Sequence, residues 1–346
     1  MSGRTLTRRD LNRALLARQL LLERARGPLP RILERIGGIQ AQYAPSMYVG
    51  LWSRFEGFER DDLTDALKRR SVVQGTLMRS TIHLVSARDY WPLSIAIRSA
   101  RREQFLRSRR GVSASQIAPA AKRVRAALAR GPMTRAEIDE LLDRPGATLF
   151  NGLGLWTDLV RAPPAGTWER RRADVYASAE QWLGPPQVDE GDGIELLVKR
   201  YLSGFGPAPR NDIASWTGLP VKRLEPALGR LRLRRFRAED GSELLDVARA
   251  PLPDPDTPAP ARLLPVWDST LLVHARRTGI LPEEYRPRIF NTKTPHSVNT
   301  FLVDGAVAGT WRYDKDRVKL EPFGGLDRSI RRELDQEAER LGAFYA

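Results

Sequence analysis

The N-terminal stretch of the chain has the apolar spacing of an amphipathic helix. Thr7 offers a side-chain oxygen that can cap a helix N-terminus. The apolar positions that follow recur at the spacing of one helix face: Leu11, Leu15, Leu16 and Leu20. The pattern therefore predicts a helix that begins near Thr7.

Two shorter helices and a strand pair are predicted next. One helix covers residues 30–36 and is stopped by Gly37 and Gly38, and another covers residues 63–70. Residues 72–86 carry β-branched residues with the alternation that favours strands. In a winged helix, helices come first and a hairpin follows, so this order of elements predicts a winged helix.

This order of helices and then strands recurs twice further along the chain. Residues 90–129 predict two long helices, and residues 131–159 predict two shorter ones before a strand, turn, strand passage over 160–180. A third repetition covers residues 193–249, which end in a strand pair turning near Asp240. We therefore expect a tandem of small domains and not a short-period solenoid.

The composition changes after a proline-rich linker. Residues 262–320 alternate β-branched, aromatic and polar residues, including the segment WDSTLLVH, and predict short strands. Asp304 and Gly305 fit a type I′ hairpin turn, and residues 326–341 predict a last helix. Such a count of short strands fits a small β-barrel.

The expected fold class is α+β, with three tandem winged-helix motifs and a small C-terminal β-barrel. The expected boundaries are residues 1–112, 113–186 and 187–250 for the winged helices, 251–261 for the linker, and 262–346 for the barrel-like part with its helix.

The charge balance points to a polyanionic partner. The chain has 57 Lys and Arg against 42 Asp and Glu, a net charge of +15. This charge favours nucleic acid first and an acidic membrane surface second. Arginine-rich coding could also raise the charge without selection for binding, since few of these cations are lysines.

Cysteine and histidine usage argues against a metal centre. The sequence has no cysteine, which excludes disulfides and thiolate ligands, and its three histidines lie far apart. We therefore expect a mechanism without metal or cofactor. The N-terminus lacks the apolar core of a secretory signal, so a cytoplasmic protein with no membrane partner is expected.

Five sequence blocks carry a family resemblance: GIQAQY at 38–43, RSTIHLV at 79–85, GLWTDLVRAPPAGTW at 154–168, LPVWDSTLLVHARR at 264–277 and TFLVDGAVAGTW at 300–311. In this order, the blocks resemble the winged-helix DNA glycosylases of the AlkZ and YcaQ kind. The resemblance implies a C-shaped scaffold around duplex DNA and a monomeric enzyme. Gln40 and Gln42 match the catalytic Q-x-Q signature of the AlkZ branch, whereas the YcaQ branch has Q-x-D.

The resemblance implies a monofunctional glycosylase that removes N7-alkylguanine, above all bulky natural-product adducts and interstrand crosslinks, for self-resistance. A glutamine side chain has no useful pKa and cannot act as a general base. It can hold a water molecule and direct an amide oxygen at a developing positive charge. No lysine adjoins the segment, so a Schiff-base step has no nucleophile there. In isolation the pair Gln40 and Gln42 would be read first as caps of backbone groups at a helix end, and the surrounding blocks favour the catalytic role instead. Spacing i,i+2 puts both on one side only in extended or irregular backbone.

Further residues are candidates for supporting roles. Arg79, Thr81 and His83 belong to a block near the catalytic segment, although His83 could instead be a buried wing residue. The run Arg170, Arg171 and Arg172 lies in a predicted wing turn, where phosphate contacts are common. His274 and His296 are weaker DNA-facing candidates. Other basic pairs, including Arg101 and Arg102, are predicted to be solvated faces.

Two alternatives come from other functional classes. A DNA-binding regulator would use tandem winged helices without catalysis, and a resistance protein could sequester the free toxin. Affinity for DNA falls steeply with salt whereas capture of a small molecule does not, so salt dependence separates these cases.

Overall fold

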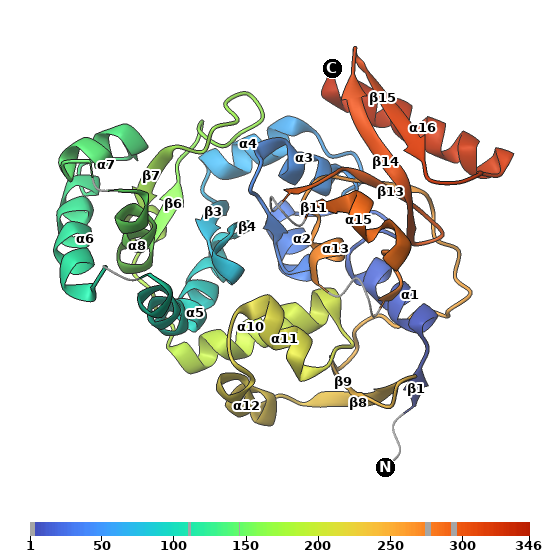
Figure 1. Cartoon of the computed structure of the whole chain (residues 1–346), viewed down its shortest axis with the longest axis horizontal. Helices are drawn as coiled ribbons and strands as arrows, with labels where there is room; N and C mark the ends of the chain where they lie inside the picture. The colour runs from blue at the N-terminus through green and yellow to red at the C-terminus, as the bar shows by residue number, and fades with distance from the viewer. Residues whose placement is uncertain (1–3, 110–111, 145, 274–277, 292–295) are drawn as a thin grey trace.

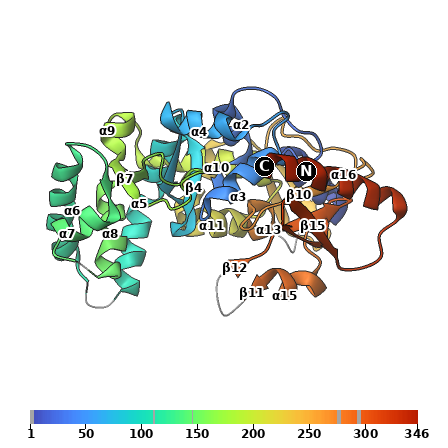
Figure 2. The same cartoon turned by 90° about the horizontal axis from the view of Figure 1, so that it is seen from above.

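The computed structural model describes residues 4–109, 112–144, 146–273, 278–291 and 296–346. Helices and short sheets alternate along the chain, which gives the expected α+β class (Figure 1). The view from above is elongated, with α6 (Ala114–Leu128), α7 (Arg135–Leu141) and α8 (Ala147–Thr157) at one end and α16 (Arg328–Tyr345) at the other (Figure 2). No helix within the described ranges is both long and apolar enough to cross a bilayer.

The N-terminal helices follow their predicted caps. Helix α1 (Arg8–Arg18) begins after Thr7, whose Oγ1 accepts the N–H of Asp10 at 3.1 Å. Helix α2 (Leu29–Ile36) ends at Gly37 in the left-handed region, with φ 78°.

The next two helices differ in how well the sequence predicts them. Helix α4 (Arg60–Lys68) is close to its prediction. Helix α3 (Ala44–Trp52) was not predicted, because all of its residues are buried and it has no polar face to reveal the helical period.

A six-stranded antiparallel sheet joins the first two predicted units. Its strand order is β2 (Ile39–Gln40), β4 (Ile82–Ser86), β3 (Val72–Thr76), β6 (Leu159–Arg161), β7 (Val175–Ser178) and β5 (Met133–Thr134). The junction is the pairing of β3 with β6, where Gln74 lies opposite Arg161. The long helix α5 (Ala87–Ser108) leaves this sheet from Ser86, whose Oγ accepts the N–H of Asp89 at 3.1 Å. The short α9 (Ala179–Leu183) follows β7.

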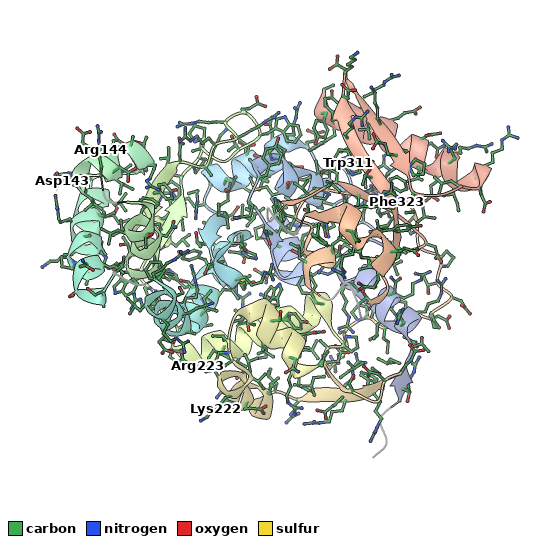
Figure 3. The ribbon with its side chains drawn as sticks, in the orientation of Figure 1. Asp143, Arg144, Lys222, Arg223, Trp311 and Phe323 are labelled. Carbon is green, nitrogen blue, oxygen red and sulfur yellow. The ribbon has the colours of Figure 1, made fainter. Side chains whose placement is uncertain are left out.

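The third predicted unit packs against α5. It contains α10 (Glu190–Phe205), α11 (Arg210–Thr217), α12 (Val221–Arg230), β8 (Leu233–Ala238) and β9 (Glu243–Val247), and β1 (Thr5–Leu6) adds to β8 as a parallel strand. Arg223 lies on α12 (Figure 3). Its Nη1 donates to Ser99 Oγ on α5 at 2.7 Å. The third unit is therefore tied to the first by polar contacts as well as by its core.

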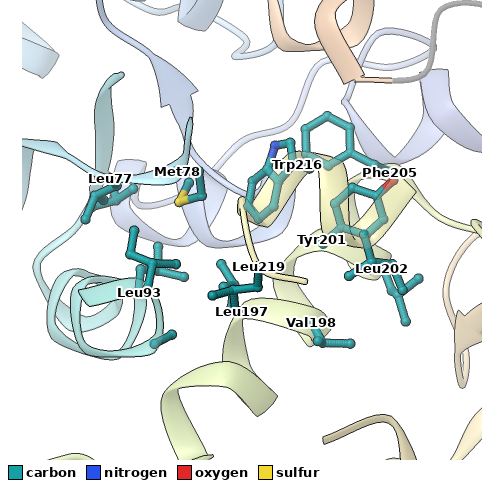
Figure 4. Packing of buried hydrophobic residues seen from close by; sticks show 14 of the residues in the cluster. Leu77, Met78, Leu93, Leu197, Val198, Tyr201, Leu202, Phe205, Trp216 and Leu219 are labelled. Carbon is teal, nitrogen blue, oxygen red and sulfur yellow. The ribbon is translucent and has the colours of Figure 1, made fainter. Parts of the chain in front are cut away.

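The largest apolar cluster lies between these units. Leu77 and Met78, which follow β3, share it with Leu93 of α5, Leu197 of α10 and Trp216 of α11 (Figure 4). Leu77, Met78 and Leu197 are fully buried. Each such side chain contributes about 1.5–3 kcal/mol to folding, so the turn that follows β3 is firmly anchored.

The C-terminal sheet is open and is not the expected barrel. It has the order β10 (Arg262–Leu264), β13 (Thr300–Val303), β14 (Ala306–Asp314) and β15 (Arg317–Pro322), with β10 and β15 as its edges within the described residues. Helix α16 packs against β15 and β10. The expected turn at Asp304 and Gly305 is confirmed, with φ 45° and 79°.

Part of one segment expected to be a strand is a helix. Residues of the WDSTLLVH segment form α13 (Ser269–Val273) because buried Asp268 accepts the N–H and Oγ1–H of Thr270, at 3.0 and 2.8 Å, and so caps the helix. Further described elements of this part are η2 (Glu283–Tyr285), α15 (Arg286–Ile289) and the pair β11 (Phe290–Asn291) and β12 (His296–Ser297).

Candidate active site

The Q-x-Q segment has the extended and irregular backbone that its spacing requires. Gln40 is the last residue of β2 and lies opposite His83 of β4. Gln42 stands in a bend just before α3. Gly38 directs the chain into β2 with φ 81°, and a Cβ there would meet Val85 Cγ1 at 2.9 Å, so a side chain does not fit.

Both glutamine side chains are held by hydrogen-bond donors. Gln40 is 5% exposed, and its Oε1 accepts from Arg79 Nη2 at 3.0 Å. Gln42 is exposed, and its Oε1 accepts the backbone N–H of Ile82 at 2.7 Å. Because each partner can only donate, both amide oxygens are fixed in direction, and each keeps a second lone pair for another donor.

The turn that carries Arg79 is strained. Arg79 and Ser80, in η1 (Met78–Ser80), have φ 52° and 60°, and left-handed backbone of this kind costs about 1–3 kcal/mol per residue. The buried neighbours Leu77 and Met78 hold the turn, and the Leu77 N–H donates to the Thr81 carbonyl at 2.9 Å. Burial lowers the pKa of Arg79. In the described part of the chain, no carboxylate forms an ion pair with this guanidinium.

His83 is buried and neutral. Its Nδ1 lies 3.1 Å from the Thr81 carbonyl oxygen, which can only accept, so Nδ1 carries the proton. Burial, followed by the charge of Arg79, lowers the pKa of His83 to about 3. Its Nε2 is buried without a hydrogen-bond partner among the described residues. The side chain therefore supplies no proton near neutral pH. Its role in the described structure is to fill the buried space beside β4.

The predicted wing turn approaches the Q-x-Q segment. Arg171 Nη1 donates to the hydroxyl of Tyr43 at 3.4 Å, and Tyr43 is 45% exposed directly after Gln42. The loop is fixed by Trp168, which packs edge-on against Tyr48 at 5.6 Å, and by Gln74 Nε2, which donates to the Gly166 carbonyl at 2.8 Å.

The other predicted DNA-contacting residues lie in different surroundings. Arg170 and Arg172 both pair with Asp174 at 3.2 Å, so only Arg171 of the run reaches the segment. His296 is on β12 in the C-terminal part. His274 lies outside the described residues.

A cavity of about 440 Å³ opens beside Gln42, between α5, α8 and strands β3, β6 and β7. The prediction that Arg101 and Arg102 form a solvated face is wrong. Arg101 lines the cavity and donates to the Thr76 carbonyl at 2.8 Å, and Arg102 donates to the Leu155 carbonyl at 2.8 Å. The available signal was that Arg101 continues the apolar face of α5 one helical turn after Ile97.

Groups of three or more acidic or histidine side chains that could hold a metal ion do not occur in the part of the chain that the structure describes.

Comparisons with known proteins give the family. A sequence model described as "DNA glycosylase AlkZ-like" matches residues 33–344. The fold is similar to that of the Streptomyces sahachiroi DNA glycosylase AlkZ, with a TM-score of 0.81 and 17% identity over 99% of this chain and 97% of that chain. No curated protein sequence matches the chain. Since the family match spans nearly the whole chain, this protein belongs to the AlkZ-like DNA glycosylase family.

Proposed function

We propose that the protein hydrolyses the N-glycosidic bond of N7-alkylguanine in duplex DNA, with Gln40 and Gln42 at the reacting centre. The observation that carries this proposal is that two amide oxygens are fixed, that of Gln40 at 3.0 Å from Arg79 Nη2 and that of Gln42 at 2.7 Å from the backbone nitrogen of Ile82, and that Gln42 lines a cavity. The DNA glycosylase family of the chain supports the same reaction type.

The substrate class follows from what glutamine can and cannot do. Alkylation at N7 makes the guanine cationic, so the C1′–N9 bond breaks with its electron pair moving into the base, which leaves neutral. No acid is needed for that step. The sugar becomes oxocarbenium-like, and the free lone pairs of the amide oxygens can face this charge and orient the attacking water.

Proton transfer goes to solvent in this scheme. Water adds to C1′, and the oxonium group so formed loses one proton to bulk water. The product is an abasic site with a hydroxyl group on C1′. The lysine nearest to Gln42 along the sequence is Lys68, which pairs with Asp65 at 3.3 Å on an exposed helix face. Among the described residues that line the cavity beside Gln42 there is no lysine, which supports a monofunctional enzyme without a lyase step.

The preferred lesions are bulky natural-product adducts and crosslinks, and the biological role is self-resistance. The order of elements in residues 4–250 supports DNA binding through winged-helix-like units, and we propose that one copy of the chain suffices. The net charge of +15 suits duplex DNA and predicts a steep salt dependence of binding.

The test is base release from a duplex with one N7-alkylguanine, by the wild type and by Gln40→Ala and Gln42→Ala. The matched control is Gln181→Ala, an exposed glutamine on α9 away from the segment. Each site variant should lower the single-turnover rate about 100-fold or more while DNA affinity stays within about two-fold. The control should match the wild type.

Wild-type protein that binds the duplex but releases no base would refute the proposal in favour of a regulator. Tight capture of the free alkylating compound, without base release, would indicate a sequestering resistance protein.

A further inference from the structure

The cavity beside Gln42 has the size of a small-molecule site. Its volume of about 440 Å³ lies in the range of roughly 300–1,000 Å³ found for ligand pockets. Gln42, Ser80 and Ile82 form the wall toward the Q-x-Q segment, and α5 and α8 form the far walls. The space therefore adjoins the proposed reacting centre and extends away from it.

Two arginines in this cavity lack a carboxylate partner. Arg101 Nη1 donates to the Thr76 carbonyl and Arg161 Nη1 donates to Thr76 Oγ1, both at 2.8 Å. Their Nε atoms are buried with no hydrogen-bond partner in the described residues. The nearby carboxylate of Asp158 is engaged by Arg98 at 2.9 Å. Burial lowers the pKa of Arg101 to about 10.

A buried charge without an ion-pair partner destabilises the protein unless hydrogen-bond acceptors surround it. The hydrogen bonds just described go to neutral oxygen atoms of Thr76 and use one Nη atom of each arginine, so both guanidiniums retain donor capacity toward the cavity. A ligand group with oxygen acceptors, such as a carbonyl or phenolic oxygen, would accept hydrogen bonds from the free N–H groups of both guanidiniums.

The remaining walls suit a planar group. Phe105 of α5, Phe150 of α8 and Tyr176 of β7 line the cavity, and the Phe150 and Tyr176 rings meet edge-on at 5.5 Å. The Arg161 guanidinium lies 5.3 Å from the centre of the Tyr176 ring. Aromatic walls with guanidinium donors match an aromatic ring that carries oxygen substituents.

We infer that this cavity binds the planar, oxygen-bearing end of the arm attached to N7 of the damaged guanine, and so selects bulky aromatic adducts over small ones. The inference rests on the proposed function. N7 and N9 belong to the same ring of guanine, so an arm on N7 begins next to the bond that is cut. Gln42 faces both the cavity and, as proposed, the reacting centre.

Gly154 offers a way to fill the cavity without disturbing the fold. It lies on α8 and lines the cavity, and a Cβ built there meets nothing within 4 Å. Replacing a helical glycine also favours the helix. Gly152 is unsuitable, because its Cβ would meet Ile117 and Phe105 at 3.0 and 3.1 Å.

The experiment compares two duplexes, one with N7-methylguanine and one with guanine bearing a two-carbon N7 arm that ends in a benzamide. Single-turnover release is measured for the wild type, Gly154→Leu and Arg161→Met, with Gly229→Leu as the matched control, since a Cβ on α12 at Gly229 also meets nothing. Gly154→Leu should slow release of the benzamide adduct about 10-fold or more and leave methyl release within about two-fold. Arg161→Met should act in the same direction, and the control should do neither.

A second measurement needs no catalysis. Free N-(2-hydroxyethyl)benzamide is titrated into the full chain without DNA and followed by ligand-observed NMR. Binding to the wild type that disappears in Gly154→Leu supports the inference even if neither base is released, which would refute the proposed function alone.

Two results overturn the inference. One is equal release of both adducts by the wild type and Gly154→Leu. The other is equal loss of both adducts together with weaker DNA binding and a smaller salt slope, which would assign the guanidiniums to a DNA phosphate.

Discussion

Buried arginines occur in two different settings in this molecule. Where its parts join, Arg18 pairs with Asp246 at 2.7 Å and Arg54 with Asp268 at 2.8 Å, and these four side chains are at most 3% exposed. Around the candidate site, three other arginines donate only to neutral oxygens within the described residues: Arg79, Arg101 and Arg161.

The difference separates architecture from function. The paired arginines bring their counter-ion with them, so their charge is balanced once the chain is folded. The charges of Arg79, Arg101 and Arg161 have no carboxylate partner among the described residues. This is expected of a site whose ligand brings the hydrogen-bond acceptors. The predictions below test this division, beginning with the largest expected effect.

Breaking an architectural pair should cost the most. Arg54→Met leaves Asp268 buried without its partner and should lower the free energy of unfolding by about 3–5 kcal/mol, measured by urea denaturation. The double variant Arg54→Met with Asp268→Asn removes both charges and should recover at least half of that loss. Equal instability of the single and double variants would contradict the assignment.

Removing an unpaired arginine should affect activity and not stability. Arg79→Met frees the Gln40 side chain, whose Oε1 is now held at 3.0 Å, and should lower the single-turnover rate of base release about 10- to 100-fold. The free energy of unfolding should change by less than about 1 kcal/mol, because no ion pair is lost. Arg79→Lys keeps a donor and should restore part of the rate. An unchanged rate in Arg79→Met would remove this residue from the site.

His83 should make the protein sensitive to acid. Its pKa is about 3 in the folded state and near 6.5 in the unfolded chain, so the unfolded chain binds the extra proton between these values. The stability is fully present above pH 6.5 and is lost as the pH falls toward 3, by up to about 1.4 kcal/mol per pH unit.

The measurement is the urea midpoint at several pH values for the wild type and for His83→Asn, whose amide can replace Nδ1–H. The variant should show a shallower loss in acid. The rate of base release should not change with the titration of this residue between pH 6 and 9. Parallel stability curves for the two proteins would show that His83 is not held neutral.

The smallest effect concerns the exposed loop. Arg171 donates to Tyr43, whereas Arg172 pairs with Asp174, so the same division between neutral and carboxylate partners recurs at the surface. Arg171→Ala should lower the release rate at saturating DNA about three-fold, since one hydrogen bond beside Gln42 is lost. Arg172→Ala should leave that rate unchanged. Equal rates for the two variants would place Arg171 among the ordinary solvated cations.

Local pattern predicted most helices, and its failures have definite causes. Helix α5 and the hairpin of β3 and β4 follow their predictions because their caps and alternation are visible in the sequence. Helix α3 was missed because it is buried on every side. Helix α13 was read as a strand because its cap, Asp268, is recognisable only once Arg54 is seen to hold it in place.

The sequence predicted the Q-x-Q segment of the candidate site but not the cavity beside it. If both glutamines face one substrate, their i,i+2 spacing predicts extended or irregular backbone, and Gln40 at the end of β2 and Gln42 in a bend have such backbone. Their resemblance to a catalytic motif pointed to their role, which stays a prediction. The cavity was invisible, because it joins Thr76, Arg101 and Arg161 from three separate elements, and no local pattern reports such a meeting.

The pairing of β3 with β6 also has a consequence during synthesis. The edge of β3 that faces Arg161 has no partner until residues 159–178 have left the ribosome, so it stays open while α5 through α8 are being made. Unpaired strand edges in nascent chains are sites of wrong association. The first two units should therefore fold together. A chain arrested before β6 should stay bound to chaperones, and it should be released only after the six-stranded sheet has formed.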